Sequence, residues 1–509
     1  MIDNNLQIKK NGQLIIRWLI IIIVLLIVTK RAWVSDDAYI TLRTVDNFIN
    51  GYGLTWNVNE RVEVYTHPLW MLLLSFFYLF THEAYLTTIF VSLGLVLFTL
   101  VYLQFKIKPL SHLILVFLVL GLSNAFVDFS TSGLENALSY TLITLLFFQF
   151  FNNKSPKENY FIIVFNVGLI GLNRLDLLLL VFPVLIFVFF QQPNKWIAIK
   201  YGLLALSPFI VWEIVSYIYY GYLFPNTYYA KINSGISSIE LILQGFFYFI
   251  ASLKRDPLTL LIIFFGIIFG LLNKNMIIRL FSFGLLLYLG YILKIGGDFM
   301  VGRFLVIPFL ISIFVLFIGF FSKLDGPKIV LTSLLTILVG ILSPTPTFQQ
   351  LNPNGYFEAY HGIVDEREIY YYGTSLFRYG VFNFEPGLDW IEDGRELNRK
   401  VENFEYHLKP YLSIGYLGYY AGPKIYIIDR SGLGNAFLAH QSISDFTDWR
   451  IGHYKRGIEE DYLMSLELGK NLIIDKDLAD LFEDVVIRTQ YDVSEKSRLK
   501  YILTIDNIQ

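Results

Sequence analysis

A succession of apolar runs between Trp18 and Leu342 constrains the fold of this sequence more than any other feature. Hydrophobic residues make up 55% of the 509 residues and charged residues only 16%, and the mean hydropathy is +0.53. A soluble core cannot hide so much apolar surface, so most of it must face lipid. We therefore predict an all-α polytopic membrane bundle.

The runs predict about eleven membrane-spanning helices, separated by polar turns. Lys9, Lys10 and Arg17 precede the first span, which places the N-terminus in the cytoplasm by the positive-inside rule. The run Pro68–Phe80 is short for a span and predicts a juxtamembrane or re-entrant helix, whereas Ser237–Lys254 predicts an amphipathic helix on the outer face. The predicted spans are Trp18–Val28, Tyr85–Leu103, Leu110–Phe126, Ala137–Phe151, Phe161–Leu172, Leu177–Phe190, Tyr201–Tyr217, Leu258–Leu272, Ile277–Leu293, Phe304–Phe321 and Ile329–Leu342.

The apolar runs stop at about Ser343, which divides the chain into two predicted domains. Residues 1–343 form the transmembrane domain, and residues 344–509 form a soluble extracytoplasmic α/β domain. Hydrophobic patterning in the second domain predicts helices at Tyr462–Leu468 and Asp477–Glu483. It also predicts four short strands, at Tyr426–Asp429, Leu472–Asp475, Val485–Arg488 and Tyr501–Thr504.

Composition excludes several kinds of chemistry. The chain has no cysteine, so disulfides, thiol nucleophiles and thiolate metal sites are absent. A net charge of −2 gives no reason to expect a nucleic-acid partner. Carboxylates and imidazoles could hold a divalent metal, but nothing in the sequence demands one, and we expect that no cofactor is required.

An adjacent acidic pair, Asp36 and Asp37, follows the first apolar run and marks the most informative loop of the chain. Carboxylates this close to hydrocarbon are costly unless they line a wet cavity or meet a partner, so a functional site is the default interpretation. Aspartate is also favoured as the cap of a helix, and a helix is predicted to begin near Ala38. One aspartate fits the cap and the other the chemistry, and their spacing does not assign the roles.

Five polar islands fall on the same outer side of the predicted bundle, so we expect them to converge on a charged, hydrogen-bonding ligand. They are Asp36–Asp37 with Arg43, Asp128 with Glu135, Arg174 with Asp176, Asn226 with Lys231, and Asp298 with Arg303.

The candidate binding residues differ in the strength of their signal. Arg303 and Lys231 are the best phosphate ligands, because a guanidinium fork matches phosphate oxygens and a lysine supplies a point charge. Glu63 and His67 share the loop of the acidic pair, where the histidine is a ligand, a base or simply an interfacial residue. His453 could touch a glycan or a lipid phosphate, although an ordinary surface loop without a function is the favoured explanation of its segment.

Nine segments, in the same order along the chain, resemble a known family. They read DDAYITLR with GYGLTWN and VEVYTHPLW, then SGLEN, NRLD, FPNTYYAK, GGDFMVGRFLVIP, IIDRSGLGNAFLAH and WRIGHYKR. This ordered set is similar to the membrane arabinofuranosyltransferases that add terminal β-(1→2) arabinofuranose in mycobacterial cell-wall synthesis. The resemblance implies a GT-C architecture, with a catalytic acid in the first extracytoplasmic loop and an extracytoplasmic C-terminal domain.

The same resemblance implies a polyprenyl-phosphate-linked sugar donor and a glycan or glycolipid acceptor. Asp36 or Asp37 would be the catalytic carboxylate, and Arg303 and Lys231 the phosphate contacts. The expected protein is therefore a glycosyltransferase of the inner (plasma) membrane that moves a pentofuranose such as arabinofuranose on the extracytoplasmic side. A transporter or flippase for a lipid-linked glycan is the main alternative, and a scaffolding subunit is a third.

Overall fold

The protein is described by a computed structural model, which defines residues 2–152, 155, 157–349, 360–377 and 387–505. The chain is predominantly helical and forms two compact units, which are described separately. Unit 1 comprises Met1–Ser35, Thr88–Ser207 and Ser238–Pro386. Unit 2 comprises Asp36–Thr87, Pro208–Ser237 and Gly387–Gln509. The predicted boundary at residue 343 stays a prediction.

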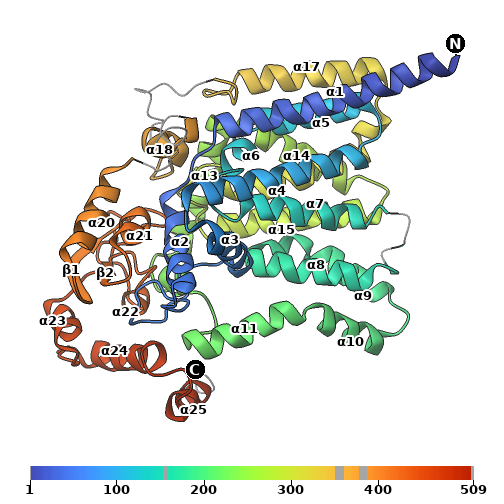
Figure 1. The fold of residues 1–509 in the computed structure, drawn as a ribbon. Helices are drawn as coiled ribbons and strands as arrows, with labels where there is room; N and C mark the ends of the chain where they lie inside the picture. The colour runs from blue at the N-terminus through green and yellow to red at the C-terminus, as the bar shows by residue number, and fades with distance from the viewer. Residues whose placement is uncertain (1, 153–154, 156, 350–359, 378–386, 506–509) are drawn as a thin grey trace. The chain divides into compact units, whose positions relative to one another are not determined.

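Unit 1 is a bundle of apolar helices that run side by side in Figure 1. Its central member is α16, in which every residue from Val306 to Leu316 is buried. Helix α16 packs against α5, α7, α14 and α15. The helices of unit 1 are α1 (Ile2–Lys30), α4 (Tyr85–Lys106), α5 (Leu110–Leu122), α6 (Asn124–Phe129), α7 (Asn136–Gln149), α8 (Tyr160–Asn173), α9 (Leu178–Gln191), α10 (Lys195–Ala205), α13 (Ser238–Arg255), α14 (Pro257–Leu271), α15 (Met276–Lys294), α16 (Val306–Gly319), α17 (Gly326–Ile341) and α18 (Glu366–Thr374).

Small residues bring these helices together. A Cβ on Gly266 of α14 would lie 2.4 Å from the Cβ of Ser312 in α16, and a Cβ on Gly284 of α15 would lie 1.9 Å from the carbonyl oxygen of Leu180 in α9. Helices pack this closely in membranes because dispersion contacts, rather than the hydrophobic effect, hold them together in lipid. The glycines therefore fix the spacing of the bundle.

A helix forms at each of the eleven predicted spans, with breaks at Ser123 and Leu206. Among the described residues, four helices are long and apolar enough to cross a membrane, and a bent pair formed by α10 and α11 (Ser207–Tyr220) gives a fifth. Several others are shorter apolar helices, so the chain is a membrane protein by helix composition, while the number eleven stays a prediction. The four helices that are long enough to cross a membrane are Asn11–Lys30, Tyr85–Lys106, Met276–Lys294 and Arg303–Lys323.

Unit 2 combines early and late segments of the chain. Helix α2 packs against both α3 and α21, and the short strands β1 and β2 pair in parallel, with Glu405 opposite Ile425 and His407 opposite Ile427. Its elements are α2 (Asp36–Ile49), α3 (Pro68–Thr81), α12 (Asn226–Ile232), α20 (Asp389–Lys400), β1 (Glu405–Tyr411), α21 (Gly415–Ala421), β2 (Ile425–Asp429), α22 (Ala436–Ala439), α23 (Glu460–Leu468), α24 (Lys476–Thr489) and α25 (Lys496–Ile505).

The short elements of the C-terminal region test the sequence predictions individually. The strand at Tyr426–Asp429 is confirmed in β2, and the helices at Tyr462–Leu468 and Asp477–Glu483 are confirmed in α23 and α24. Three predicted strands are wrong: Val485–Arg488 lies in α24, Tyr501–Thr504 lies in α25, and Leu472–Asp475 is irregular.

The reason for these errors is visible in α24. Its buried residues are Phe482, Val485, Arg488 and Thr489, which is helical spacing that a four-residue window cannot distinguish from a strand. The Asp475 carboxylate accepts hydrogen bonds from the backbone N–H groups of Asp477 and Leu478, so the preceding segment serves as the helix cap.

Candidate functional site

Three of the predicted polar islands meet within unit 1, at the ends of apolar helices. Glu135 directly precedes α7, and Arg174 directly follows α8. Asp298 follows α15, and Arg303 opens the short 3-10 helix before α16. The sequence placed these helix ends on one side of the bundle, and their contacts confirm that they adjoin.

Arg174 is held firmly in this cluster. Its Nε donates to Asp176 Oδ1 at 3.1 Å and its Nη2 to Asp176 Oδ2 at 2.5 Å. The hydroxyl of Tyr288 in α15 donates to the same carboxylate at 2.8 Å and accepts from Arg174 Nη2 at 3.0 Å. A two-pronged pair with a further donor is the strongest arrangement open to a guanidinium, so Arg174 is a fixed structural cation.

Arg303 forms two longer ion pairs in the same cluster. Its Nη1 lies 3.4 Å from Asp298 Oδ2, and its Nη2 lies 3.7 Å from Glu135 Oε1. The side chain is 14% exposed, whereas that of Arg174 is 5% exposed. The contact with Asp298 is a long hydrogen bond, and the contact with Glu135 is an ion pair beyond hydrogen-bond distance.

Glu135 links the two arginines, because its Oε1 also lies 3.5 Å from Arg174 Nη1. The cluster holds three carboxylates, from Glu135, Asp176 and Asp298, against two guanidiniums. An anionic ligand would therefore have to separate Arg303 from its acids rather than fill a vacant positive site. The aromatic ring of Phe304 lies beside both guanidinium groups, at 5.1 Å from Arg174 and 5.8 Å from Arg303.

The acidic pair of the first loop lies in unit 2, where Asp36 and Asp37 occupy different environments. Asp36 is buried, and its Oδ1 and Oδ2 accept the backbone N–H groups of Tyr416 at 2.8 Å and Gly415 at 3.1 Å. Burial raises the pKa of the Asp36 carboxyl, and the two N–H groups oppose that rise. Asp37 is partly exposed. Both aspartates begin α2, and Asp36 also accepts the first backbone N–H groups of α21.

Arg43 and His67, the other candidates around α2, make contacts inside unit 2. The Nη2 of Arg43 donates to the carbonyl oxygens of Ile425 at 2.7 Å and Gly422 at 3.2 Å, and its guanidinium lies 4.3 Å from the ring of Trp56. Burial lowers the pKa of Arg43 to about 9. His67 is buried, with its Nε2 2.9 Å from the hydroxyl of Thr41. These contacts tie α2 to the rest of the unit.

Glu63 and Asn226 border a small aromatic pocket in unit 2. The Glu63 carboxylate accepts from the hydroxyl of Ser216 at 2.8 Å, and its carbonyl oxygen accepts from the backbone N–H of Asn226 at 2.9 Å. Burial raises the pKa of Glu63 to about 8, so the carboxyl is largely protonated at neutral pH and can donate a hydrogen bond. Four rings surround the pocket, from Tyr220, Tyr222, Phe224 and Tyr229.

The last two candidates lie elsewhere in unit 2. Lys231 is exposed in the last turn of α12. His453 pairs with Arg450 in an isolated bridge, and burial together with the charge of Arg450 lowers its pKa to about 4. His453 is therefore a neutral imidazole at physiological pH and carries no charge for a phosphate.

Several buried charged residues were not among the sequence-predicted candidates. Glu60 accepts from the hydroxyl of Tyr426 at 2.7 Å and the backbone N–H of Ala436 at 3.1 Å. Arg31, Arg255 and Arg367 gather around Asp128 in unit 1. Arginines at the predicted outer ends of helices contradict the positive-inside bias, and this signal could have revealed Arg31 and Arg255. Within the part of the chain that the structure describes, no group of three or more His, Asp or Glu side chains is arranged to hold a metal ion.

Comparisons with known proteins identify relatives for part of the chain. A terminal β-(1→2)-arabinofuranosyltransferase of Corynebacterium glutamicum is 29% identical over 323 residues, which cover 55% of this chain and 46% of the relative. A protein of the same description from Mycobacterium tuberculosis is 47% identical over 45 residues, 9% of this chain and 7% of the relative. No family model and no solved structure matches.

The match therefore spans about half the length of the Corynebacterium relative. It agrees with the resemblance that the ordered sequence segments indicated. Over the matched part, this membrane chain is similar to the terminal β-(1→2)-arabinofuranosyltransferases.

Proposed function

We propose that this protein is a glycosyltransferase that moves a pentofuranose, such as arabinofuranose, from a polyprenyl-phosphate donor to a cell-envelope glycan. The similarity to named arabinofuranosyltransferases is the observation that carries the proposal. The proposal includes a GT-C-like bundle of about eleven spans in the inner membrane, with a cytoplasmic N-terminus and the reaction on the extracytoplasmic side. It requires no resident cofactor.

In this proposal Asp37 is the catalytic carboxylate and Asp36 is a positioning residue. Both oxygens of Asp36 accept backbone N–H groups of α21, so this side chain has a structural task. Asp37 is partly exposed and lies at the same helix start. A general base must reach the proton that it removes, and an accessible carboxylate meets that need better than a buried one.

The reaction exchanges one bond for another. The acceptor hydroxyl oxygen forms a bond to the anomeric carbon of the sugar while the bond from that carbon to the phosphate oxygen breaks. The acceptor proton passes to the Asp37 carboxylate, and polyprenyl phosphate leaves with the bonding electrons. Negative charge grows on the phosphate as the bond breaks, so cations near it stabilise the transition state.

Arg303 and Lys231 are the proposed phosphate contacts. The partial exposure of Arg303, 14% of its side chain, supports its role, because a ligand can reach an accessible guanidinium. The exposure of Lys231 supports a role for that residue. The rings and the protonated carboxyl of the Glu63 pocket suit a sugar, since aromatic faces pack on apolar sugar surfaces and Glu63 can donate a hydrogen bond.

A transfer assay in proteoliposomes tests the proposal. The full chain is incubated with a radiolabelled polyprenyl-phosphate pentofuranose and cell-envelope glycan, and glycan labelling is measured with and without a chelator. Arg303→Gln should reduce labelling, whereas Arg279→Gln, on an exposed surface of α15, serves as the matched control. Movement of the labelled donor across the membrane without label in the glycan would refute transfer and indicate a flippase.

A further inference from the structure

A group of apolar side chains is exposed on unit 2, in α23 and in the segment that joins it to α24 (Figure 1). The group, called here the α23 patch, consists of Met464, Leu468, Leu472 and Ile474. Ile474 is 89% exposed, the highest value for a large apolar side chain among the described residues. Single exposed apolar side chains need no explanation, whereas an exposed group marks an interaction surface.

The turn after α23 brings the two halves of the patch together. Gly469 ends the helix with a φ of 62°, in the left-handed region that glycine favours, and the chain reverses there. The returning segment is bonded to α23, because the backbone N–H of Leu472 donates to the Ser465 hydroxyl at 2.9 Å. The backbone N–H of Ile474 donates to the Asp461 carboxylate, also at 2.9 Å. Asp461 and Ser465 share a helix face with both patch residues of α23, so the four apolar side chains are neighbours.

The patch stands on a packed aromatic core. The ring of Tyr462 in α23 stacks on the ring of Phe437 in α22 at 4.5 Å. Both rings contact Phe482 of α24, at 5.9 Å from Tyr462 and 5.6 Å from Phe437. Helix α23 therefore buries one face in unit 2 and exposes the patch on another. A surface held in this way is already formed before a partner arrives, which lowers the entropy cost of binding.

Acidic side chains surround the patch in the sequence. Residues 459–483 contain eight carboxylates and two lysines, a formal charge of −6, whereas the whole chain carries −2. Seven of the eight acidic residues are exposed, and Asp461 is half-buried. The eight are Glu459, Glu460, Asp461, Glu467, Asp475, Asp477, Asp480 and Glu483. The negative charge of this protein is thus concentrated beside the exposed apolar group.

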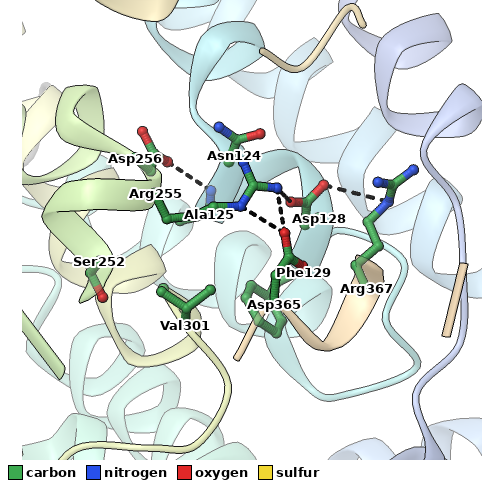
Figure 2. A pocket seen from close by; sticks show the side chains of 11 residues that line it. Asn124, Ala125, Asp128, Phe129, Ser252, Arg255, Asp256, Val301, Asp365 and Arg367 are labelled. Atoms are coloured by element: carbon green, nitrogen blue, oxygen red, sulfur yellow. Dashed lines mark hydrogen bonds and ion pairs between the residues drawn. The ribbon is translucent and has the colours of Figure 1, made fainter. Parts of the chain in front are cut away.

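This surface charge is not balanced within its own segment, unlike the buried charges of unit 1. Figure 2 shows Arg255 and Arg367 beside Asp128 and Asp365, and these side chains form ion pairs with one another. In residues 459–483, six carboxylates remain after the two lysines are matched. Exposed charges act on one another over about 10 Å at moderate salt. Cations on a binding partner can meet this surplus.

We propose that the α23 patch is the docking surface for a partner protein whose contact segment carries apolar side chains flanked by lysines and arginines. The apolar group forms the dry centre of the interface, and the carboxylates form its polar rim. An anionic lipid surface, or a second copy docked through the same patch, would meet the rim with like charge, which is unfavourable. The patch contains no aromatic ring on which a sugar could stack. This inference goes beyond sugar transfer and uses no residue of the proposed catalytic or donor site.

Site-specific photocrosslinking in the native cells tests the proposal. p-Benzoylphenylalanine is incorporated in the full-length protein in place of Met464, and in a matched control in place of Tyr491. Tyr491 is also exposed and lies beyond the other end of α24, a helix of about 20 Å. We expect one dominant protein to crosslink at position 464 and not at position 491. Its crosslinked peptide, identified by mass spectrometry, should contain apolar residues and a net positive charge.

The other occupants are outcomes that would overturn the proposal. They are a crosslink to lipid, a crosslink to a second copy of this chain, and a crosslink to a peptide without net positive charge. The same conclusion follows if no product is specific to position 464.

The crosslinked segment is then made as a peptide, and its binding to the full-length protein in zwitterionic nanodiscs is measured. Ile474→Ser should weaken binding about tenfold, as removal of a central apolar contact does. The unfolding midpoint should stay within ~1 °C, because the side chain is almost fully exposed. Glu467→Gln should slow association and reduce its salt dependence, because rim charges steer the encounter. Tyr491→Ser is the matched control and should change neither quantity.

Equal affinity for Ile474→Ser and the parent protein, or binding that is insensitive to salt, would contradict the docking surface. Neither experiment measures sugar transfer, so a failure here leaves the proposed function standing.

Discussion

The two adjacent aspartates at the start of α2 should respond differently to the same substitution. Asp36→Asn keeps one acceptor oxygen but turns an amide N–H₂ toward one of the two backbone donors that now lie 2.8 Å and 3.1 Å away. One charge-assisted hydrogen bond is lost, and one buried N–H group of α21 is left unsatisfied. Each such loss costs about 1–3 kcal/mol, so we expect a fall of about 2 kcal/mol in the free energy of unfolding.

Thermal unfolding measures this loss. For a unit of roughly 200 residues, about 2 kcal/mol corresponds to a fall of ~4–8 °C in the midpoint. Asp37→Asn should leave the midpoint within ~1 °C, because substitution of a partly exposed side chain has a small effect. The same Asp37 variant should lose about 10²–10⁴-fold in sugar transfer, the usual contribution of general acid–base catalysis.

Comparison of Asp36→Asn with Asp37→Asn tests the roles assigned to the two aspartates. Transfer rates are compared in proteoliposomes that contain equal amounts of folded protein, so a stability loss in Asp36→Asn is not mistaken for a catalytic one. An unchanged midpoint for Asp36→Asn would show that its two hydrogen bonds do not matter. Parental transfer by Asp37→Asn, together with abolished transfer by folded Asp36→Asn, would reverse the assigned roles.

Three further predictions follow from single contacts. Glu63 has a pKa raised to about 8 from 4.5, so its neutral form is stabilised in the fold and the stability that it adds is lost as the pH rises from 4.5 through 8. Glu63→Gln should remove this slope of at most about 1.4 kcal/mol per pH unit in pH-dependent unfolding, and an unchanged slope would contradict the shift. Gly415→Ala should lower the unfolding midpoint, because the added Cβ would lie 1.8 Å from the Asp36 carbonyl oxygen. Gly290→Ala is the control, because a Cβ at that position has open space around it. Equal midpoints for the two variants would disprove the clash. Arg303→Lys should weaken the apparent affinity for the donor while changing the unfolding midpoint little, because a lysine keeps the charge but lacks the guanidinium fork. A donor affinity equal to that of the parent protein, measured by titration of the transfer rate, would exclude a two-pronged contact.

Local sequence patterns predicted much of the helical fold. Long apolar runs form helices because a buried or lipid-facing backbone must satisfy its own hydrogen bonds, and apolar side chains offer no alternative hydrogen-bond partners. The short C-terminal elements were harder: a run such as Val485–Arg488 is compatible with either a strand or the last turn of a helix. Its position in α24 depends on Asp475, ten residues earlier, which caps that helix.

The sequence by itself determined where the polar islands lie, because the alternation of apolar runs decides which helix ends share a side. Five islands were predicted to converge; Glu135, Arg174, Asp298 and Arg303 are in contact, whereas Asp128 pairs with Arg31 and the convergence of the remaining islands stays a prediction. Only the tertiary structure decided how each charge is used. The backbone partner of Asp36, Gly415, is 379 residues away in sequence, and Asp128 is paired with Arg31, which is 97 residues away. Such partners are chosen by packing in three dimensions, and no local pattern in the chain records them.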